Sequence, residues 1–161
     1  MIVRAATLAD VPAMRALHEE IIRLGGTTSY LVPFSAEGFV QNYLAPPDTI
    51  CCHVAVAGDA VAGFQSLGFW PGLPEGWADI GTFVRPGLQR SGAGTALFLA
   101  TVGAARAAGI TTINAAIRAD NQPGLGYYRK RGFVTYESQP DYCLSDGRRV
   151  GRFLKRFDLS A

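Results

Sequence analysis

The chain has 161 residues and a mass of 17.2 kDa, and we expect residues 1–161 to form a single domain. Hydrophobic residues make up 48% of the chain and charged residues 17%, a composition that excludes an intrinsically disordered protein. The net charge of +2 is too small to indicate a nucleic-acid partner, and no apolar run reaches the roughly 18 residues that would predict a membrane helix.

The first half of the chain predicts a short strand, two helices and three strands. Residues 2–6 favour a strand, and residues 7–10 resemble a capping box that begins a helix. Apolar residues then recur at helical spacing until Gly25, and a second helix is capped by Ser35 and ended by Pro46. The three strands of this half are predicted at 50–57, 60–70 and 78–84.

The second half predicts a helix, a strand, a short helix and two final strands. Residues 92–108 are rich in Ala and Leu and favour a helix that ends at Gly109. Pro123 opens the short helix and Gly132 closes it, while the strands are predicted at 110–117, 133–136 and 150–159. The order β-α-α-β-β-β-α-β-α-β-β predicts a mixed α/β fold, with an antiparallel first half and a right-handed parallel crossover over residues 78–117.

The N-terminal residues and the cysteines indicate the compartment. The chain begins without the basic, apolar and small-residue segments of a secretory signal, so we expect a cytoplasmic protein without membrane partners. Cys51, Cys52 and Cys143 are odd in number and form no CxxC pair, which argues against a disulfide framework or a zinc site. We therefore expect no bound metal.

The stretch from Phe83 to Leu97 is a strand, a glycine-containing loop and the start of a helix. Backbone N–H groups at a helix N-terminus are free to bind phosphate oxygens, and Gly92 and Gly94 allow a ligand to come close. Leu97 stands where a dinucleotide-binding fingerprint needs its third glycine, and no Gly-Lys-Ser/Thr sequence marks a P-loop. The two glycines alone fit either a phosphate site or tight packing between helix and strand.

Two motifs together resemble the GCN5-related N-acetyltransferase (GNAT) superfamily. Gln89-Arg-Ser-Gly-Ala-Gly94 matches the Q/R-x-x-G-x-G/A signature of that superfamily. Asn121 then precedes a helix that bears Tyr128 and ends in Gly132-Phe133, as in the later segment of these proteins. The resemblance covers nearly the whole chain, and the TTSY loop with GTFVRPGLQRSGAG is similar to the phosphinothricin acetyltransferase branch.

The resemblance implies the GNAT fold, which is a central, mostly antiparallel sheet with a parallel pair splayed at the cofactor site and about four flanking helices. It also implies acetyl-CoA as cosubstrate, with the strand backbone at Phe83 and Val84 pairing with the pantetheine arm. Asn121 should reach the cofactor with its side chain, and Arg131 should meet either the 3′-phosphate or an acidic acceptor. The pyrophosphate should be held by the backbone of Gln89, Arg90, Ser91, Gly92, Ala93, Gly94 and Thr95.

Direct transfer without a covalent enzyme intermediate is the mechanism that the resemblance implies. The Val84 N–H should stabilise the developing oxyanion, and Tyr128 should protonate the CoA thiolate, unless Tyr128 is only a packed aromatic residue. Asp79 is the first candidate for the base that deprotonates the amine, and Glu75 is the second.

The acceptor pocket should lie between the loops 27–34 and 70–77. Thr28, Tyr30, Trp70, Glu75 and Trp77 are the candidate substrate-binding residues, whereas Phe34 and Phe69 are expected mostly in the core. Eight of the fifteen basic residues lie between Arg129 and Arg156, as a solvated face or as a docking face for an anionic ligand.

The predicted function is acetyl transfer to a primary amine of a small molecule, with an amino acid or an amino-acid-like compound as first choice. A protein or peptide N-acetyltransferase and a non-catalytic acyl-CoA sensor remain alternatives, because fold alone does not fix function. The resemblance also allows a homodimer.

Overall fold

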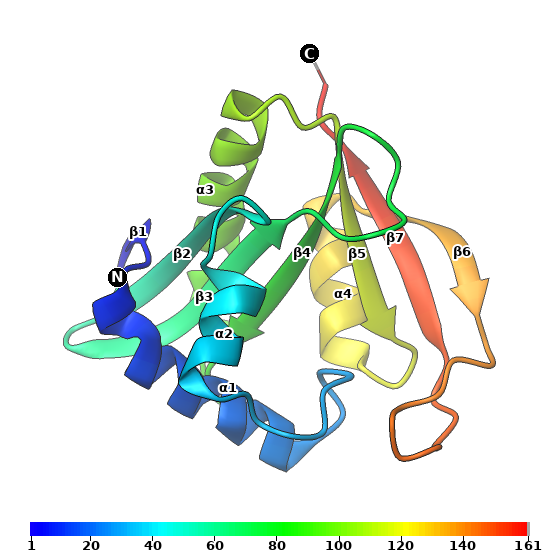
Figure 1. The fold of residues 1–161 in the computed structure, drawn as a ribbon, viewed down its shortest axis with the longest axis horizontal. Helices are drawn as coiled ribbons and strands as arrows, with labels where there is room; N and C mark the ends of the chain where they lie inside the picture. Colours follow the sequence, from blue (N-terminus) through cyan, green and yellow to red (C-terminus); the bar gives the residue numbers. More distant parts are fainter. Residues whose placement is uncertain (161) are drawn as a thin grey trace.

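The computed structural model describes residues 1–160 and confirms the predicted order of strands and helices (Figure 1). A single 3-10 turn, Leu8–Asp10, precedes the first long helix. The elements are β1 Ile2–Ala5, α1 Val11–Leu24, α2 Ala36–Tyr43, β2 Thr49–Ala57, β3 Ala60–Gly68, β4 Trp77–Val84, α3 Ala93–Ala107, β5 Thr112–Arg118, α4 Gln122–Arg131, β6 Val134–Gln139 and β7 Arg152–Asp158.

The strands form one seven-stranded sheet in the order β1-β2-β3-β4-β5-β7-β6. Every neighbouring pair is antiparallel except β4 and β5, which are parallel, as the crossover predicted. The parallel pairing joins only Trp77, Ala78 and Asp79 to residues 112–114, although β4 continues to Val84 beside β3. Beyond Asp79 the two parallel strands therefore separate, and their backbone groups lose their partners across the gap.

Helices cover both faces of the sheet (Figure 1). The apolar sides of α1 and α2 pack on one face against a cluster that contains Phe64 and Phe83. The other face carries α3 and α4, whose side chains pack against Ala78, Ile80 and their neighbours on β5. Since side chains alternate along a strand, Asp79 faces the same side as Phe83.

The start of α1 shows how local chemistry fixes an element. The Asp10 carboxylate accepts a hydrogen bond of 2.8 Å from the Thr7 N–H and two of 2.8 Å from the Arg4 guanidinium. The Arg4 guanidinium lowers the pKa of Asp10 to about 2. Ser35 plays the expected role at α2, because its Oγ accepts from the Gly38 N–H at 3.1 Å.

The largest boundary error concerns β6, which extends to Gln139 instead of ending at 136. The residues from Val134 to Ser138 are exposed on an edge strand and carry little apolar alternation. Backbone pairing with β7, rather than burial, defines this strand, and a hydrophobicity pattern gives no indication of such pairing.

Candidate active site

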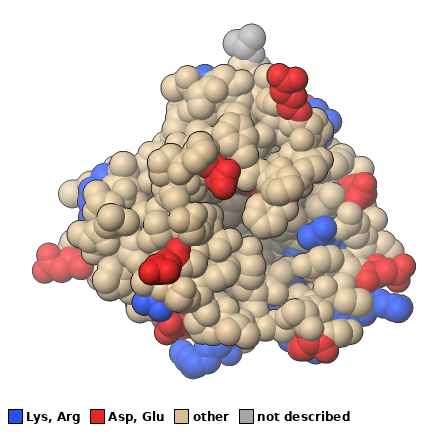
Figure 2. Space-filling model, in the orientation of Figure 1, with Lys and Arg blue, Asp and Glu red and all other residues tan. Residues whose placement is uncertain are grey.

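A large cleft opens beside the two separating strands. Its volume is about 2560 Å³, and its lining runs from the 27–32 loop across β4 and β5 to α4 and β7. Figure 2 shows the molecular face hollowed near its centre, with Lys, Arg, Asp and Glu side chains mainly toward the periphery. Among residues 1–160, the lining includes every predicted site residue except Ser91, Ala93 and Glu75.

The loop before α3 carries an unsatisfied row of backbone donors. The Ser91 N–H and Leu88 N–H bond within the loop, and the Ala93 N–H lies 3.4 Å from the Ser91 Oγ. Within the described residues, no hydrogen bond engages the N–H groups of Gln89, Arg90, Gly92, Gly94 and Thr95. Donors of this kind at a helix N-terminus fit the pyrophosphate of a CoA ester.

The two glycines of the loop have different roles. Gly92 has a φ of +92°, and a Cβ on it would meet nothing within 4 Å, so its surface is open to the cleft. A Cβ on Gly94 would lie 2.7 Å from Cε2 of Tyr127, whose hydroxyl donates to the Gly94 carbonyl at 2.7 Å. Gly92 therefore leaves room for a ligand, and Gly94 allows α3 and α4 to approach.

Two further residues predicted to bind the cofactor have partners within the protein. Arg131 donates from Nη1 to the Thr95 Oγ1, which places a guanidinium beside the start of α3. Asn121 caps α4 by accepting from the Gly124 N–H at 3.0 Å, and its Nδ2 donates to the Thr27 carbonyl at 3.2 Å. The Asn121 side chain thus joins α4 to the 27–34 loop.

The gap between β4 and β5 presents the Val84 backbone. The Arg85 N–H donates to the Ala62 carbonyl at 2.8 Å, so it points toward β3. Successive N–H groups along a strand point in opposite directions, and the Val84 N–H therefore points away from β3, into the gap. Within residues 1–160 the pairing of β4 with β5 ends at Asp79, so this donor has no partner on β5, and Val84 lines the cleft.

Tyr128 reaches the same gap from the opposite face of the sheet. Its hydroxyl lies 2.8 Å from the Thr82 Oγ1, and only 7% of the residue is exposed. Burial raises the pKa of Tyr128, so the phenol keeps its proton at neutral pH. A buried phenol with its proton can act as a donor inside the cleft.

Asp79 lies at the closed end of the gap, in the last paired row of the two parallel strands. Its Oδ1 accepts a hydrogen bond of 2.8 Å from Nδ2 of Asn114, the residue opposite it on β5. Burial raises the pKa of Asp79 to about 6, while the Asn114 bond and the charge of Arg152 act in the other direction. A carboxylate with a pKa close to neutrality is suited to proton transfer.

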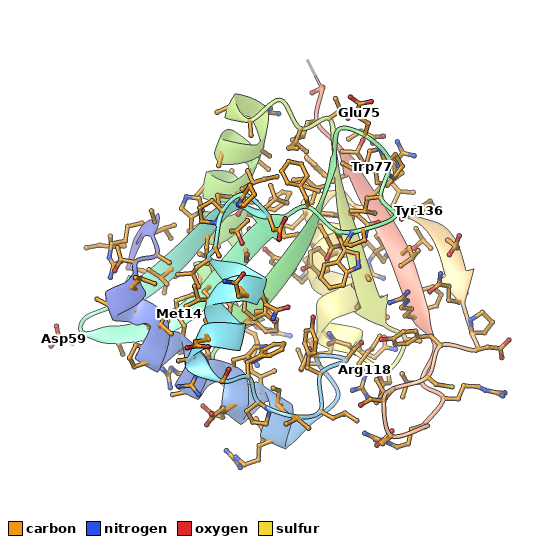
Figure 3. The ribbon with its side chains drawn as sticks, in the orientation of Figure 1. Met14, Asp59, Glu75, Trp77, Arg118 and Tyr136 are labelled. Carbon is orange, nitrogen blue, oxygen red and sulfur yellow. The ribbon has the colours of Figure 1, made fainter. Side chains whose placement is uncertain are left out.

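Arg118 is a cleft residue that the sequence did not reveal. It is 4% exposed, pairs with Asp120 at 2.7 Å and donates to the Thr28 carbonyl at 2.9 Å. This contact fixes the 27–34 loop on the end of β5, as Figure 3 shows. The only sequence signal was a charged residue at the end of an apolar strand.

The predicted acceptor residues occupy the two expected loops. Thr28, Tyr30, Trp70 and Trp77 line the cleft, whereas Glu75 lies on the outer side of its loop, beyond Trp77 (Figure 3). The expectation for Phe69 was wrong, because 52% of this residue is exposed. Its strand ends at Gly68, so Phe69 has already left the sheet and lines the cleft instead of the core. Phe34 does pack against the buried cluster below α1 and α2.

A sheet with helices on both faces, and a parallel pair that separates beside the free N–H groups of a helix N-terminus, is the architecture that the resemblance to acyl-CoA transferases implied. The sequence profile of the Acetyltransferase (GNAT) family matches residues 14–133, and the chain belongs to this family. It is therefore an acetyltransferase, and acetyl-CoA is its acetyl donor.

Three known proteins are similar to this chain. The L-methionine sulfoximine/L-methionine sulfone acetyltransferase of Pseudomonas aeruginosa is 29% identical over 94% of this chain and 88% of that protein. The structure of yncA from Salmonella typhimurium, which contains acetyl-CoA, has a TM-score of 0.88 at 19% identity, covering 100% of this chain and 95% of the other. A structure with the provisional name phosphinothricin N-acetyltransferase has a TM-score of 0.83 at 22% identity, covering 99% of each chain. These similarities agree with the predicted fold and branch.

Over residues 1–160, no helix is long and apolar enough to cross a membrane. In the same residues, no group of three or more His, Cys, Asp or Glu side chains is arranged to hold a metal ion.

Proposed function

We propose that the protein acetylates the primary amine of a small acceptor that also carries an anionic group. An amino acid or a compound of the methionine sulfoximine or phosphinothricin type is the first choice. The relative from Pseudomonas aeruginosa, named for methionine sulfoximine and methionine sulfone, supports this acceptor class.

The observation that carries the proposal is a pair of opposite charges on the cleft floor. Asp79 on β4 and Arg152 on β7 both line the cleft. They lie two strands apart, and Arg152 is four residues along β7 from the residue in the row of Asp79, which gives a Cα separation of about 16 Å for an ideal sheet. The two side chains are close enough for the charge of Arg152 to lower the pKa of Asp79. An amino acid places its ammonium and carboxylate groups a few bonds apart, so it could contact both charges.

The Arg152 guanidinium is oriented to bind an anion. Its Nε donates to Gln139 at 2.5 Å, and its guanidinium lies 4.1 Å from the centre of the Tyr142 ring. Within residues 1–160 its two terminal nitrogens make no hydrogen bond. Gln139 holds the guanidinium through Nε, and Tyr142 stacks on one of its faces. The two terminal nitrogens can therefore donate a pair of parallel hydrogen bonds to a carboxylate.

The roles of the remaining residues follow from their positions. When bound, acetyl-CoA supplies an acetyl group activated as a thioester. The open backbone of Gln89 to Thr95 binds phosphate, with Arg90 and Arg131 as charged neighbours. Asp79 takes a proton from the acceptor ammonium, either directly or through one water.

On the far side of the gap, two donors complete the reaction. The amine nitrogen forms its bond to the thioester carbon while the Val84 N–H donates to the oxygen on which negative charge develops. The carbon–sulfur bond then breaks, Tyr128 donates a proton to the departing sulfur, and the second proton that the nitrogen loses restores the phenol. Both groups lie at the separation of β4 and β5, where the acetyl group would pass from one face of the sheet to the other.

Release of CoA thiol from acetyl-CoA across a panel of amines tests the proposal. The panel holds L-methionine sulfone, L-methionine sulfoximine, phosphinothricin, the natural amino acids, polyamines, an aminoglycoside, arylamines and short peptides. We expect release with the amino acid class, and loss of that release in Asp79→Asn. Release with peptides alone would assign the chain to protein acceptors, and acetyl-CoA binding without release from any amine would favour a sensor.

A further inference from the structure

A chain of two hydrogen bonds ends at the Asp79 carboxylate. The Tyr136 hydroxyl on β6 donates to the Asn114 Oδ1 on β5, and the Asn114 Nδ2 donates to the Asp79 Oδ1 at 2.8 Å. We propose that Asn114 and Tyr136 are positioning residues, which orient the Asp79 carboxylate and keep it ionised for the acceptor amine. This inference rests on the proposed function, in which Asp79 is the base.

The chemistry of the three groups fixes the direction of the chain. An ionised carboxylate only accepts hydrogen bonds, so the amide of Asn114 must turn its NH₂ group toward Asp79. The carbonyl oxygen of the amide then faces the opposite way, where a donor must satisfy it. Tyr136 supplies that donor, and Asn114 is only 5% exposed, so no bulk water can replace the phenol at low cost.

The Tyr136 ring is itself held in place. It packs edge-on against Trp77, with 5.7 Å between ring centres, and Figure 3 shows the two side chains facing one another. The guanidinium of Arg156 covers Trp77 at 4.7 Å from the ring centre. Tyr136 therefore reaches over β7 from the edge strand to a residue two strands away.

The arrangement leaves one oxygen of Asp79 free for the acceptor. Oδ1 is occupied by Asn114, and within residues 1–160 no hydrogen bond reaches Oδ2. Asp79 lines the cleft, so Oδ2 is available to the amine. A carboxylate with one anchored oxygen and one open oxygen has a defined orientation before the acceptor binds.

Several other titratable or charged groups lie near the same carboxylate. The positive charge comes from Arg152 on β7, and the phenols surround it from the 27–34 loop, α2, α4 and β6. Besides Asp79 itself, the groups are Arg152, Tyr30, Tyr43, Tyr128 and Tyr136. The four phenols stay neutral near pH 6, because the pKa of each is raised above the ordinary value of 10.0. Asn114 and Arg152 are therefore the groups that favour the ionised form.

The test compares Asn114→Leu and Tyr136→Phe with the control Thr112→Val. Thr112 lies on the same strand and face as Asn114, and its Oγ1 donates to Asp158 at 3.0 Å, away from Asp79. The first readout is the pH profile of kcat/KM with L-methionine sulfone as acceptor. The second readout needs no turnover and is the carbon-13 NMR titration of the Asp79 carboxyl, assigned by its loss in Asp79→Asn.

In Asn114→Leu, the acidic limb and the NMR midpoint should both move to higher pH by about one unit, because a donor to the ionised form is lost. Tyr136→Phe should move both in the same direction by less, with the KM for acetyl-CoA unchanged. Thr112→Val should leave both where they are. Since Tyr136→Phe keeps the ring against Trp77, it remains informative even where Asn114→Leu folds poorly.

The outcomes separate the inference from the proposed function. An Asp79 midpoint that stays in place in both variants overturns the positioning role, whatever the acceptor. If Asp79→Asn keeps the acidic limb of the wild type, the base assignment fails, and the positioning role for that base fails with it. A third result is an acidic limb of the kcat/KM profile that is lost in Asp79→Asn but keeps its wild-type position in Asn114→Leu and Tyr136→Phe. That result refutes only the positioning role.

Discussion

Replacing Asp79 with asparagine should make the folded protein more stable at neutral pH, while removing the base. The pKa of Asp79 rises from 3.8 to about 6 on folding, because the carboxylate is buried beside the gap between β4 and β5. A group whose pKa is raised on folding stabilises the protein fully below its unfolded pKa, and this contribution disappears as the pH rises through the folded pKa. The window for Asp79 therefore runs from about pH 3.8 to about pH 6.

The size of the effect follows from the shift. A rise of roughly two pKa units corresponds to about 3 kcal/mol of unfavourable free energy for the ionised folded form above pH 6. Most of the Asp79 carboxylate is desolvated, but the residue keeps partial exposure to the cleft, so we expect Asp79→Asn to gain about 1–3 kcal/mol at pH 7.5. For a chain of this length the melting temperature should rise by about 2–4 °C per kcal/mol.

Urea denaturation of both proteins at pH 7.5 and pH 4.5 measures the effect. The advantage of Asp79→Asn should be smaller at pH 4.5, where the wild-type carboxyl is protonated in the folded state. Asp10→Asn is the matched control with the opposite sign, because the Arg4 guanidinium lowers the pKa of Asp10 to about 2. That carboxylate stabilises the protein above pH 3.8 and loses its contribution as the pH falls toward 2, so Asp10→Asn should destabilise at pH 7.5.

An Asp79→Asn protein that is less stable than wild type at pH 7.5, or whose advantage does not change with pH, would refute this reasoning. In that case the carboxylate would not be held at a raised pKa, and the acidic limb of the reaction would belong to another group.

Two further substitutions test the cofactor side of the cleft. Tyr128→Phe should lower kcat by about 10²–10⁴-fold with an unchanged KM for acetyl-CoA, because the phenol donates its proton only when the sulfur departs. An unchanged kcat would refute the role of Tyr128 as the acid. Gly94→Ala should raise the KM for acetyl-CoA, since its Cβ would lie 2.7 Å from the Tyr127 ring and displace the start of α3. The control Gly103→Ala lies in the same helix with nothing within 4 Å, and should stabilise the protein by about 0.5–1 kcal/mol with normal kinetics. Equal kinetics in both alanine variants would contradict the packing role of Gly94.

The segments of the proposed cofactor half could be located from the sequence, because that half is local. The loop from Gln89 to Thr95 and the helix that carries Tyr128 are continuous segments, and short spacings in the chain determine which atoms face a ligand. The sequence could not separate the two roles of the glycine pair. Whether Gly94 packs or binds depends on Tyr127, which lies 33 residues further along the chain and on another helix.

The acceptor half was predicted less completely, because its contacts join distant strands. Asn114 and Tyr136 meet across β7, the last strand in the chain, which inserts between β5 and β6. No periodicity within one segment predicts that insertion. A weaker signal was present, since Asn114 and Arg118 are polar residues on one face of an otherwise apolar strand, and buried polar groups require partners.

The separation of β4 and β5 explains why the two halves can work together. Asp79 and Phe83 face the side of α1 and α2, whereas Tyr128 belongs to the side of α3 and α4, so a continuous sheet would place a layer of backbone between base and acid. Pairing stops at the row of Asp79 and Asn114, and the strands beyond it leave an opening lined by the Val84 N–H. A proton can then leave the acceptor on one face while another reaches the sulfur from the other face. Because Asn114 both ends the pairing and holds Asp79, the position of the proposed base is tied to the point where the opening begins.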